Sequence, residues 1–314
     1  MTTINKTGFR IVFPNNPFVL SDCIITLGNF DGIHIAHSAL LKKAVEQKKL
    51  LGATSVGAWC LETQNTSNII MSTEDKLSIF FEHGMDFVIV ADFPFFKDLS
   101  ADSFVSNHLI GELNCIGAVC GYDFKFGKNR LGDALLLQAK FGKTNTVVLG
   151  RIELDGLTVS SSQIRKFILD GDMEQARKFL GRPHFIRAEV KKGKQLGHKM
   201  NFPTANQEFA NGCIIPKFGI YATICQMSSG KKYTGVSNVG IRPTISGSID
   251  SHKVNCETHI IDFDGNIYGD TIKTEFYKFL RPEKKFSCIE QLCDAISADL
   301  EHAKSYFKQT EVDI

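Results

Sequence analysis

Two histidines, His34 and His37, stand three residues apart, where an apolar run gives way to an amphipathic one in ITLGNFDGIHIAHSALLKKA. In a first helical turn they share one face, and the free N–H groups and positive dipole of that turn favour an anion. Gly28 and Gly32, just before them, allow backbone to approach a ligand closely. The imidazoles could be metal ligands, phosphate contacts or surface polarity. A zinc site needs further ligands that no Cys/His cluster in the sequence offers, which leaves the other two interpretations.

Two later stretches in the first half could contribute to an anion site. VSSSQIRKF places Ser161 at an expected helix start and Arg165 in its first turns, which suits phosphate. Serines in that position are also ordinary helix caps. GYDFKFGKNRLGD, which contains Asp123, is a glycine-punctuated loop after the fourth expected strand.

A third stretch, GKQLGHKMNFPTAN, lies in the second half of the chain. In an extended segment, Thr204 and Asn206 point to the same side. A hydroxyl and an amide oxygen are hard ligands suited to Mg²⁺ held between protein and nucleotide phosphates. The upstream glycines Gly193 and Gly197 suit a loop over phosphates. A turn with a hydrogen-bonding threonine is the alternative interpretation.

The elements of the first half alternate between short apolar runs and amphipathic runs. Ser72 and Asp75 are spaced as a capping box, and Gly84 marks the end of that helix. The alternation predicts a doubly wound α/β domain with a parallel sheet and ligands at the carboxyl ends of its strands. The expected strands are 23–27, 54–61, 86–92, 115–121 and 145–150, and the expected helices are 37–49, 72–84, 100–113, 132–142 and 162–181.

From Phe185 onward the pattern changes to β-rich runs separated by Gly, Ser and Asp turns. A helical pattern returns only at residues 287–307. This order predicts a mostly antiparallel β-barrel with a C-terminal helix. We therefore expect two domains, residues 1–184 and 185–314.

The composition is that of a globular protein, with 314 residues, 43% hydrophobic and 22% charged. The net charge of +2 gives no broad footprint for nucleic acid or an anionic membrane, so we expect neither as a partner. The nine cysteines are odd in number and form no C-x-x-C pair, which suits reduced thiols. A membrane span needs about 18 consecutive apolar residues, and no stretch of the sequence comes near that length. No stretch resembles a signal peptide either, so we expect a cytoplasmic location.

The first-half motifs GNFDGIHIAH, GYDFKFG and SSSQIR resemble the G-x-F-D-G-x-H-x-G-H, G-x-D/N-F-x-F-G and S-S-T-x-I-R motifs of a known nucleotidyltransferase module. It is the FMN adenylyltransferase module of bacterial bifunctional riboflavin kinase/FAD synthetases. The resemblance implies that His34 and His37 hold ATP phosphates and the transition state of adenylyl transfer. It also implies nucleotide contacts for Gly28, Phe30, Asp31 and Gly32, triphosphate contacts for Ser161 and Arg165, and a place in the flavin cleft for Asp123.

In the second half, GKQLGHKMNFPTAN, GVSNVGIRPT, CETHIIDFDGNIYG and FLRPEKKF follow in the order of the flavokinase module and resemble its motifs. By that resemblance, Thr204 and Asn206 bind Mg²⁺ and ATP phosphates, together with Gly193 and Gly197. Glu257 is then the general base for the 5′-hydroxyl of riboflavin. For Arg281 the resemblance leaves two possibilities, contact with flavin or nucleotide and an ion pair with Glu283.

The resemblance covers about residues 20 to 308 and implies one enzyme with riboflavin, FMN and ATP as substrates and Mg²⁺ as cofactor. The chain departs from the pattern at Ala36, Ser162, His198 and Asn201, and CLETQNTSN stands where the family carries F-x-P-H-P. One alternative is therefore a riboflavin kinase with a degenerate first domain. A second alternative, from another class, is a non-catalytic flavin-binding regulatory protein. A nucleotidyltransferase acting on a different phosphate acceptor is conceivable for the first half alone.

Overall fold

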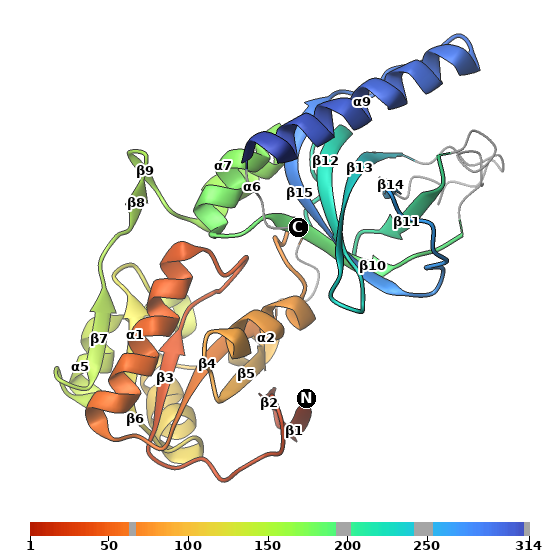
Figure 1. Cartoon of the computed structure of the whole chain (residues 1–314). Coiled ribbons are helices and arrows are strands. Elements are labelled where there is room, and N and C mark those ends of the chain that lie inside the picture. The colour runs from red at the N-terminus through yellow and green to blue at the C-terminus, as the bar shows by residue number, and fades with distance from the viewer. Residues whose placement is uncertain (63–66, 193–201, 242–253, 311–314) are drawn as a thin grey trace. The chain divides into compact units, whose positions relative to one another are not determined.

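The computed structural model describes residues 1–62, 67–192, 202–241 and 254–310, and Figure 1 shows the chain. The chain divides into two compact units, Met1–Ser161 and Ser162–Ile314. The first barrel strand begins at His184, next to the boundary expected from the sequence. The two helices before it, however, belong to the second compact unit, so the division by contacts falls earlier in the chain.

The first unit is built on a seven-stranded sheet with five parallel strands and an antiparallel hairpin at one edge. The predicted doubly wound α/β fold is confirmed, whereas the hairpin was not predicted. Its first strand is short and mostly exposed, so it carries little hydrophobic signal. The strands, in sheet order, are β1 (Thr2–Lys6), β2 (Phe9–Phe13), β5 (Phe87–Asp92), β4 (Ser55–Glu62), β3 (Cys23–Leu27), β6 (Cys115–Gly121) and β7 (Thr146–Leu149).

Helices cover both faces of this sheet. On β3, Ile25 belongs to a core that includes Leu109 and Leu137, whereas Ile24 lies on the other face, where it and Leu51 both approach Gly117. The helical elements are α1 (Ile35–Leu51), α2 (Thr73–Glu82), α3 (Phe93–Phe96), α4 (Ala101–Ser103), a π-helical segment Phe104–Glu112, a 3₁₀ turn Lys128–Arg130 and α5 (Ala134–Phe141). A small hairpin of β8 (Glu153–Leu154) and β9 (Leu157–Thr158) follows β7.

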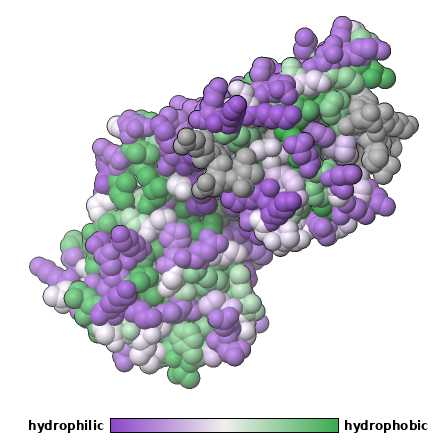
Figure 2. All heavy atoms as spheres, in the orientation of Figure 1, coloured by the Kyte–Doolittle hydropathy of each residue, from purple (hydrophilic) through white to green (hydrophobic). Residues whose placement is uncertain are grey.

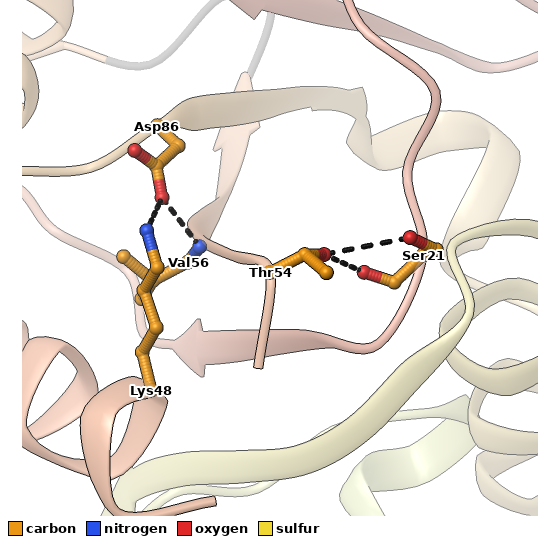
Figure 3. Close-up of polar contacts among 5 residues, drawn as sticks. All are labelled: Ser21, Lys48, Thr54, Val56 and Asp86. Atoms are coloured by element: carbon orange, nitrogen blue, oxygen red, sulfur yellow. Dashed lines mark hydrogen bonds and ion pairs between the residues drawn. The ribbon is translucent and has the colours of Figure 1, made fainter. Parts of the chain in front are cut away.

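The expected cap of α2 is present, since Ser72 Oγ accepts a hydrogen bond from the Asp75 backbone N–H at 3.1 Å. At the opposite end of the sheet from the carboxyl ends of the strands, polar contacts fix α1 to β4 and β5 (Figure 3). There Asp86 Oδ2 accepts from Lys48 Nζ at 2.6 Å and from the Val56 backbone N–H at 2.8 Å. These contacts fix the C-terminal end of α1 to the sheet. The N-terminal end of the helix, where His34 and His37 lie, is therefore placed one helix length away, towards the carboxyl ends of the strands.

The second unit starts one residue into α6 (Ser161–Asp170) and continues with α7 (Met173–Leu180), where the sequence had predicted one helical segment. The break falls at Gly171, whose φ of +80° lies in the left-handed region that glycine adopts without strain. Asp172 then caps α7 by accepting from the Gln175 backbone N–H at 3.1 Å. Residues 162–181 are therefore a helix pair.

The expected antiparallel barrel with a C-terminal helix is confirmed. The backbone N–H of Lys191 donates to Asn206 O at 2.8 Å, which joins the two edges of a six-stranded sheet. Helix α9 (Ile289–Thr310) packs on β12, β13 and β15 through Ala303, Tyr306 and Phe307 (Figure 1). The strands, in sheet order, are β10 (His184–Glu189), β15 (Thr271–Arg281), β12 (Gly219–Gln226), β13 (Lys232–Ile241), β14 (Val254–Ile260) and β11 (Thr204–Glu208).

The surface is mostly hydrophilic along α9 on the face that Figure 2 shows. In the described parts of the chain, no helix is both long and apolar enough to cross a bilayer. The nine cysteines are free thiols, and burial raises the pKa of the Cys225 thiol to about 12 and that of the Cys256 thiol to about 11.

One buried histidine should make the second unit sensitive to acid. His184 is 5% exposed, and burial, assisted by the charge of Arg182, lowers its pKa from 6.5 to about 4. The folded protein therefore keeps this imidazole neutral below pH 6.5, where the unfolded chain protonates it. The contribution to stability is complete above pH 6.5 and is lost as the pH falls towards 4, to a total of about 3 kcal/mol.

We expect hydrogen exchange of the β12 and β15 amides to show this loss between pH 7 and pH 4.5, after correction for intrinsic rates. The His184→Gln variant lacks the titrating group. The free energy of opening of its β12 and β15 amides should therefore change by about 2 kcal/mol less than that of the unmodified protein over the same pH interval. Equal pH dependence in the two proteins would contradict the assignment.

Candidate active sites

The first candidate site lies where the order of the parallel strands reverses. The order β5-β4-β3-β6-β7 places the carboxyl ends of β3 and β6 side by side, and ligands of doubly wound sheets bind at such a point. Gly28 follows the end of β3, and Asp123, which is exposed, follows the end of β6. Two motifs that are about 90 residues apart in sequence therefore meet at one edge of the sheet.

The loop after β3 has a constrained backbone. Phe30, Gly32 and Ile33 have φ values of +49°, +80° and +37°, and Phe30 is fully buried against Phe80 and His37. A Cβ on Gly32 would lie 3.0 Å from the Ile70 side chain. Phe30 and Gly32 thus determine the shape of the loop, and this explains structurally why the motif has a phenylalanine and a glycine at these positions.

The two histidines come together at the beginning of α1. Their rings are stacked, with centroids 3.7 Å apart and planes 13° apart, so they share a face as predicted. His34 is the N-cap residue itself, 5% exposed, and its Nδ1 accepts from the His37 backbone N–H at 3.3 Å. An acceptor Nδ1 leaves the proton of the neutral ring on Nε2, which is then a donor at the positive end of the helix.

A pair of hydrogen bonds joins this loop to two distant segments. Ser161 Oγ donates to Asp31 O at 2.9 Å, and Asp31 Oδ1 accepts from the Ile70 backbone N–H at 2.9 Å. The structure thus brings Ser161 of the SSSQIR motif to the FDGIH motif. Arg165 lies one turn further along α6 and belongs to the second compact unit. Asp31 and Ser161 therefore have a structural role here, and their predicted contacts with ATP remain predictions.

The segment CLETQNTSN, which departs from the family pattern, begins with residues that have charged neighbours. Residues 63–66 lie outside the described part of the chain, but Glu62 forms a bidentate pair with Arg10 at 3.0 and 3.2 Å. Burial raises the pKa of the Cys60 thiol, although the charge and hydrogen bond of the buried Lys76 partly oppose that shift. No sequence signal had pointed to Lys76.

The second candidate site lies on the outer face of the barrel, where β11 pairs with β14. The register sets Asn206 opposite Glu257 and Thr204 opposite His259, and opposed residues point to the same face. The three residues that the sequence had singled out, Thr204, Asn206 and Glu257, are thus neighbours. Gly193 and Gly197 lie outside the described residues.

A further residue joins this group that the sequence did not indicate. The side-chain amide of Asn255 donates to Asn206 Oδ1 at 2.8 Å and to Glu257 Oε1 at 3.3 Å. It is 6% exposed and stands two residues before Glu257 on the same strand. That spacing was the only available sequence signal, and it is shared by many strand residues.

Arg281 has a protein partner that neither of its two expected roles named. Its guanidinium forms a bidentate pair with Asp299 of α9, at 2.9 and 2.7 Å, and Asp299 is 3% exposed. The pair with Glu283, one of the two possibilities, is not the contact that the structure shows. Arg281 anchors the C-terminal helix to β15, and contact with flavin or nucleotide stays a prediction.

Metal binding can be assessed from the donor atoms at both sites. Among the described residues, no group of three or more His, Cys, Asp or Glu side chains is placed to hold a metal ion. The oxygens of Thr204 and Asn206 are uncharged hard donors, which suit Mg²⁺ shared with nucleotide phosphates. The Oδ1 of Asn255 is a buried acceptor with no hydrogen-bond partner in the described chain, so the surroundings also suit a cation or a donor.

Comparison with known proteins matches each half of the chain to a family model. The FAD synthetase family model matches residues 17–163, and the riboflavin kinase family model matches residues 180–307. A bifunctional riboflavin kinase/FMN adenylyltransferase from Haemophilus influenzae is 33% identical over 300 residues, covering 92% of this chain and 96% of the relative. The protein of that description from Bacillus subtilis is 32% identical and covers 90% and 92%. A crystal structure described as a macrolide-efflux protein from Streptococcus pneumoniae has a TM-score of 0.80 at 26% identity and covers 90% and 94%.

The fold and the two family matches define a transferase with a nucleotidyltransferase-like domain and a flavokinase barrel. The chain belongs to the bifunctional riboflavin kinase/FMN adenylyltransferase family.

Proposed function

We propose that this chain phosphorylates riboflavin to FMN and then transfers the adenylyl group of ATP to FMN, releasing pyrophosphate and giving FAD. The observation that carries the proposal is the match of both family models, in order, to one chain. It favours two activities over a riboflavin kinase with a degenerate first domain and over a non-catalytic flavin-binding protein. We propose residues 1–184 and 185–314 as the functional domains and the cytoplasm as the location.

The barrel site would carry out the kinase step. Glu257 accepts the proton of the 5′-hydroxyl of riboflavin as that oxygen attacks the γ-phosphorus of ATP, and the bond between this phosphorus and the β-phosphate oxygen breaks to release ADP. Thr204 and Asn206 would hold Mg²⁺ together with the ATP phosphates, and the ion, when bound, neutralises charge on the transferred phosphoryl group. Gly193 and Gly197 are proposed to contact the phosphates.

The site at the start of α1 would carry out adenylyl transfer. A phosphate oxygen of FMN attacks the α-phosphorus of ATP, and the bond to pyrophosphate breaks, so no protein nucleophile is needed. Positioning and stabilisation of charge therefore supply the catalysis. His34 and His37 donate to phosphate oxygens at the positive end of α1, and Arg165 contributes a fixed charge. Asp123 would line the flavin cleft.

The proposal is tested with the purified protein, riboflavin, ATP and Mg²⁺, by chromatographic separation of flavins over time. FMN should appear first and FAD should follow. Accumulation of FMN without FAD would favour the kinase-only alternative, and unchanged riboflavin would favour the binding protein.

A further inference from the structure

The amide of Asn255 connects the two groups that the kinase chemistry needs. Its Nδ2 lies 2.8 Å from Asn206 Oδ1 and 3.3 Å from Glu257 Oε1, and these three side chains come from two paired strands. An amide nitrogen carries two protons, so it can donate to both oxygens at once. Both acceptors belong to residues proposed to handle ATP and the substrate hydroxyl.

These donors determine how the amide of Asn206 is oriented. Asn206 Nδ2 points to Thr204 O at 3.4 Å, while its Oδ1 accepts from Asn255. The oxygen, with a second lone pair, is therefore the atom turned towards the Glu257 side of β14. Hydrogen bonds of this kind to a metal-binding side chain set its orientation and its strength as a ligand.

Neither cross-strand neighbour of Asn255 supplies a side-chain donor. Its cross-strand neighbour on β11 is Glu208, which is paired with Lys191 at 2.8 Å. Its neighbour on β13 is Gly240, and the space over this glycine holds the carboxylate of Glu283, which is an acceptor when ionised and not a donor. Asn255 and Asn206 are both buried. If the donors of Asn255 were lost, the Asn206 oxygen would lose its partner, and water could not easily take that place.

We propose that Asn255 is a positioning residue of the kinase site, which holds the Asn206 oxygen and the Glu257 carboxylate in one fixed arrangement. The inference rests on the kinase activity proposed above. Asn255 does not touch the reacting atoms and acts through its two partners. A role confined to barrel stability would affect folding and leave turnover of the folded protein unchanged.

The test compares two variants. Asn255→Ala removes the amide donors, and Asn255→Asp keeps the shape of the side chain but places a carboxylate, which only accepts, against the oxygens of Asn206 and Glu257. The control is Thr271→Ala, an exposed strand position in the barrel. For each protein we would measure kcat and KM for FMN formation, calorimetric binding of ADP with Mg²⁺, and thermal unfolding. Conversion of supplied FMN to FAD in the same sample reports whether the first domain is intact.

Both Asn255 variants should lose about 10- to 100-fold in kcat or in affinity for ADP with Mg²⁺, with KM for riboflavin little changed. The Thr271 variant should behave as the unmodified protein. Values within twofold of the unmodified protein for a folded Asn255 variant would overturn the inference, as would failure of both variants to fold. Absence of FMN formation in the unmodified protein would instead overturn the proposed function.

Discussion

Glu257→Gln should reduce the kcat of riboflavin phosphorylation by about 10²- to 10⁴-fold, the usual contribution of a general base. The amide keeps the size of the side chain and an oxygen that can accept from Asn255, so the geometry of β14 should persist. What is lost is the capacity to take the proton from the 5′-hydroxyl. KM for riboflavin should therefore change little, which separates a chemical role from a role in binding.

The measurement is steady-state formation of FMN, with conversion of supplied FMN to FAD assayed on the same preparation. The second rate should match that of the unmodified protein. Glu189→Gln, at an exposed strand position on β10, controls for the loss of a barrel carboxylate. A kcat within tenfold of the original would remove Glu257 from the role of base. Joint loss of both activities would contradict two separate sites.

The sequence allowed most of the architecture to be predicted because the local signals were strong. The apolar strands β3 to β7 and their amphipathic helices have the expected periodicity, and Ser72 caps α2 as its spacing indicated. The hairpin of β1 and β2 was missed because β1 is short and mostly exposed, so it carries little hydrophobic signal. The break at Gly171 was missed because the apolar pattern continues across it.

The candidate sites depended on contacts that sequence spacing does not encode. Asn206 and Glu257 are 51 residues apart and become neighbours only through the β11–β14 register. Register follows from the packing of the whole barrel, so the motifs could supply the residues but not their arrangement. Arg281 shows the converse, because the nearby Glu283 suggested a local pair, whereas the burial of Asp299 on α9 decided the contact.

The second large effect should come from His34, whose side chain has two separable functions. As a cap, its Nδ1 accepts from the His37 N–H, and as a donor, its Nε2–H is proposed to bind a phosphate oxygen. His34→Ala removes both, whereas His34→Asn supplies another good N-cap without an imidazole. Both variants should lose about 10²- to 10³-fold in the rate of FAD formation from FMN, comparable to removal of one donor to a developing negative charge.

Stability distinguishes the cap from the donor. His34→Ala should be less stable by about 1 kcal/mol, and His34→Asn should be close to the unmodified protein. Fluorescence of Trp59, the single tryptophan, reports unfolding of the first unit. FMN formation should be unchanged in both variants, and His302→Ala, exposed on α9, should affect neither reaction. If His34→Asn retains normal FAD formation, the imidazole serves only to begin the helix, and the phosphates must be held by other groups of that loop.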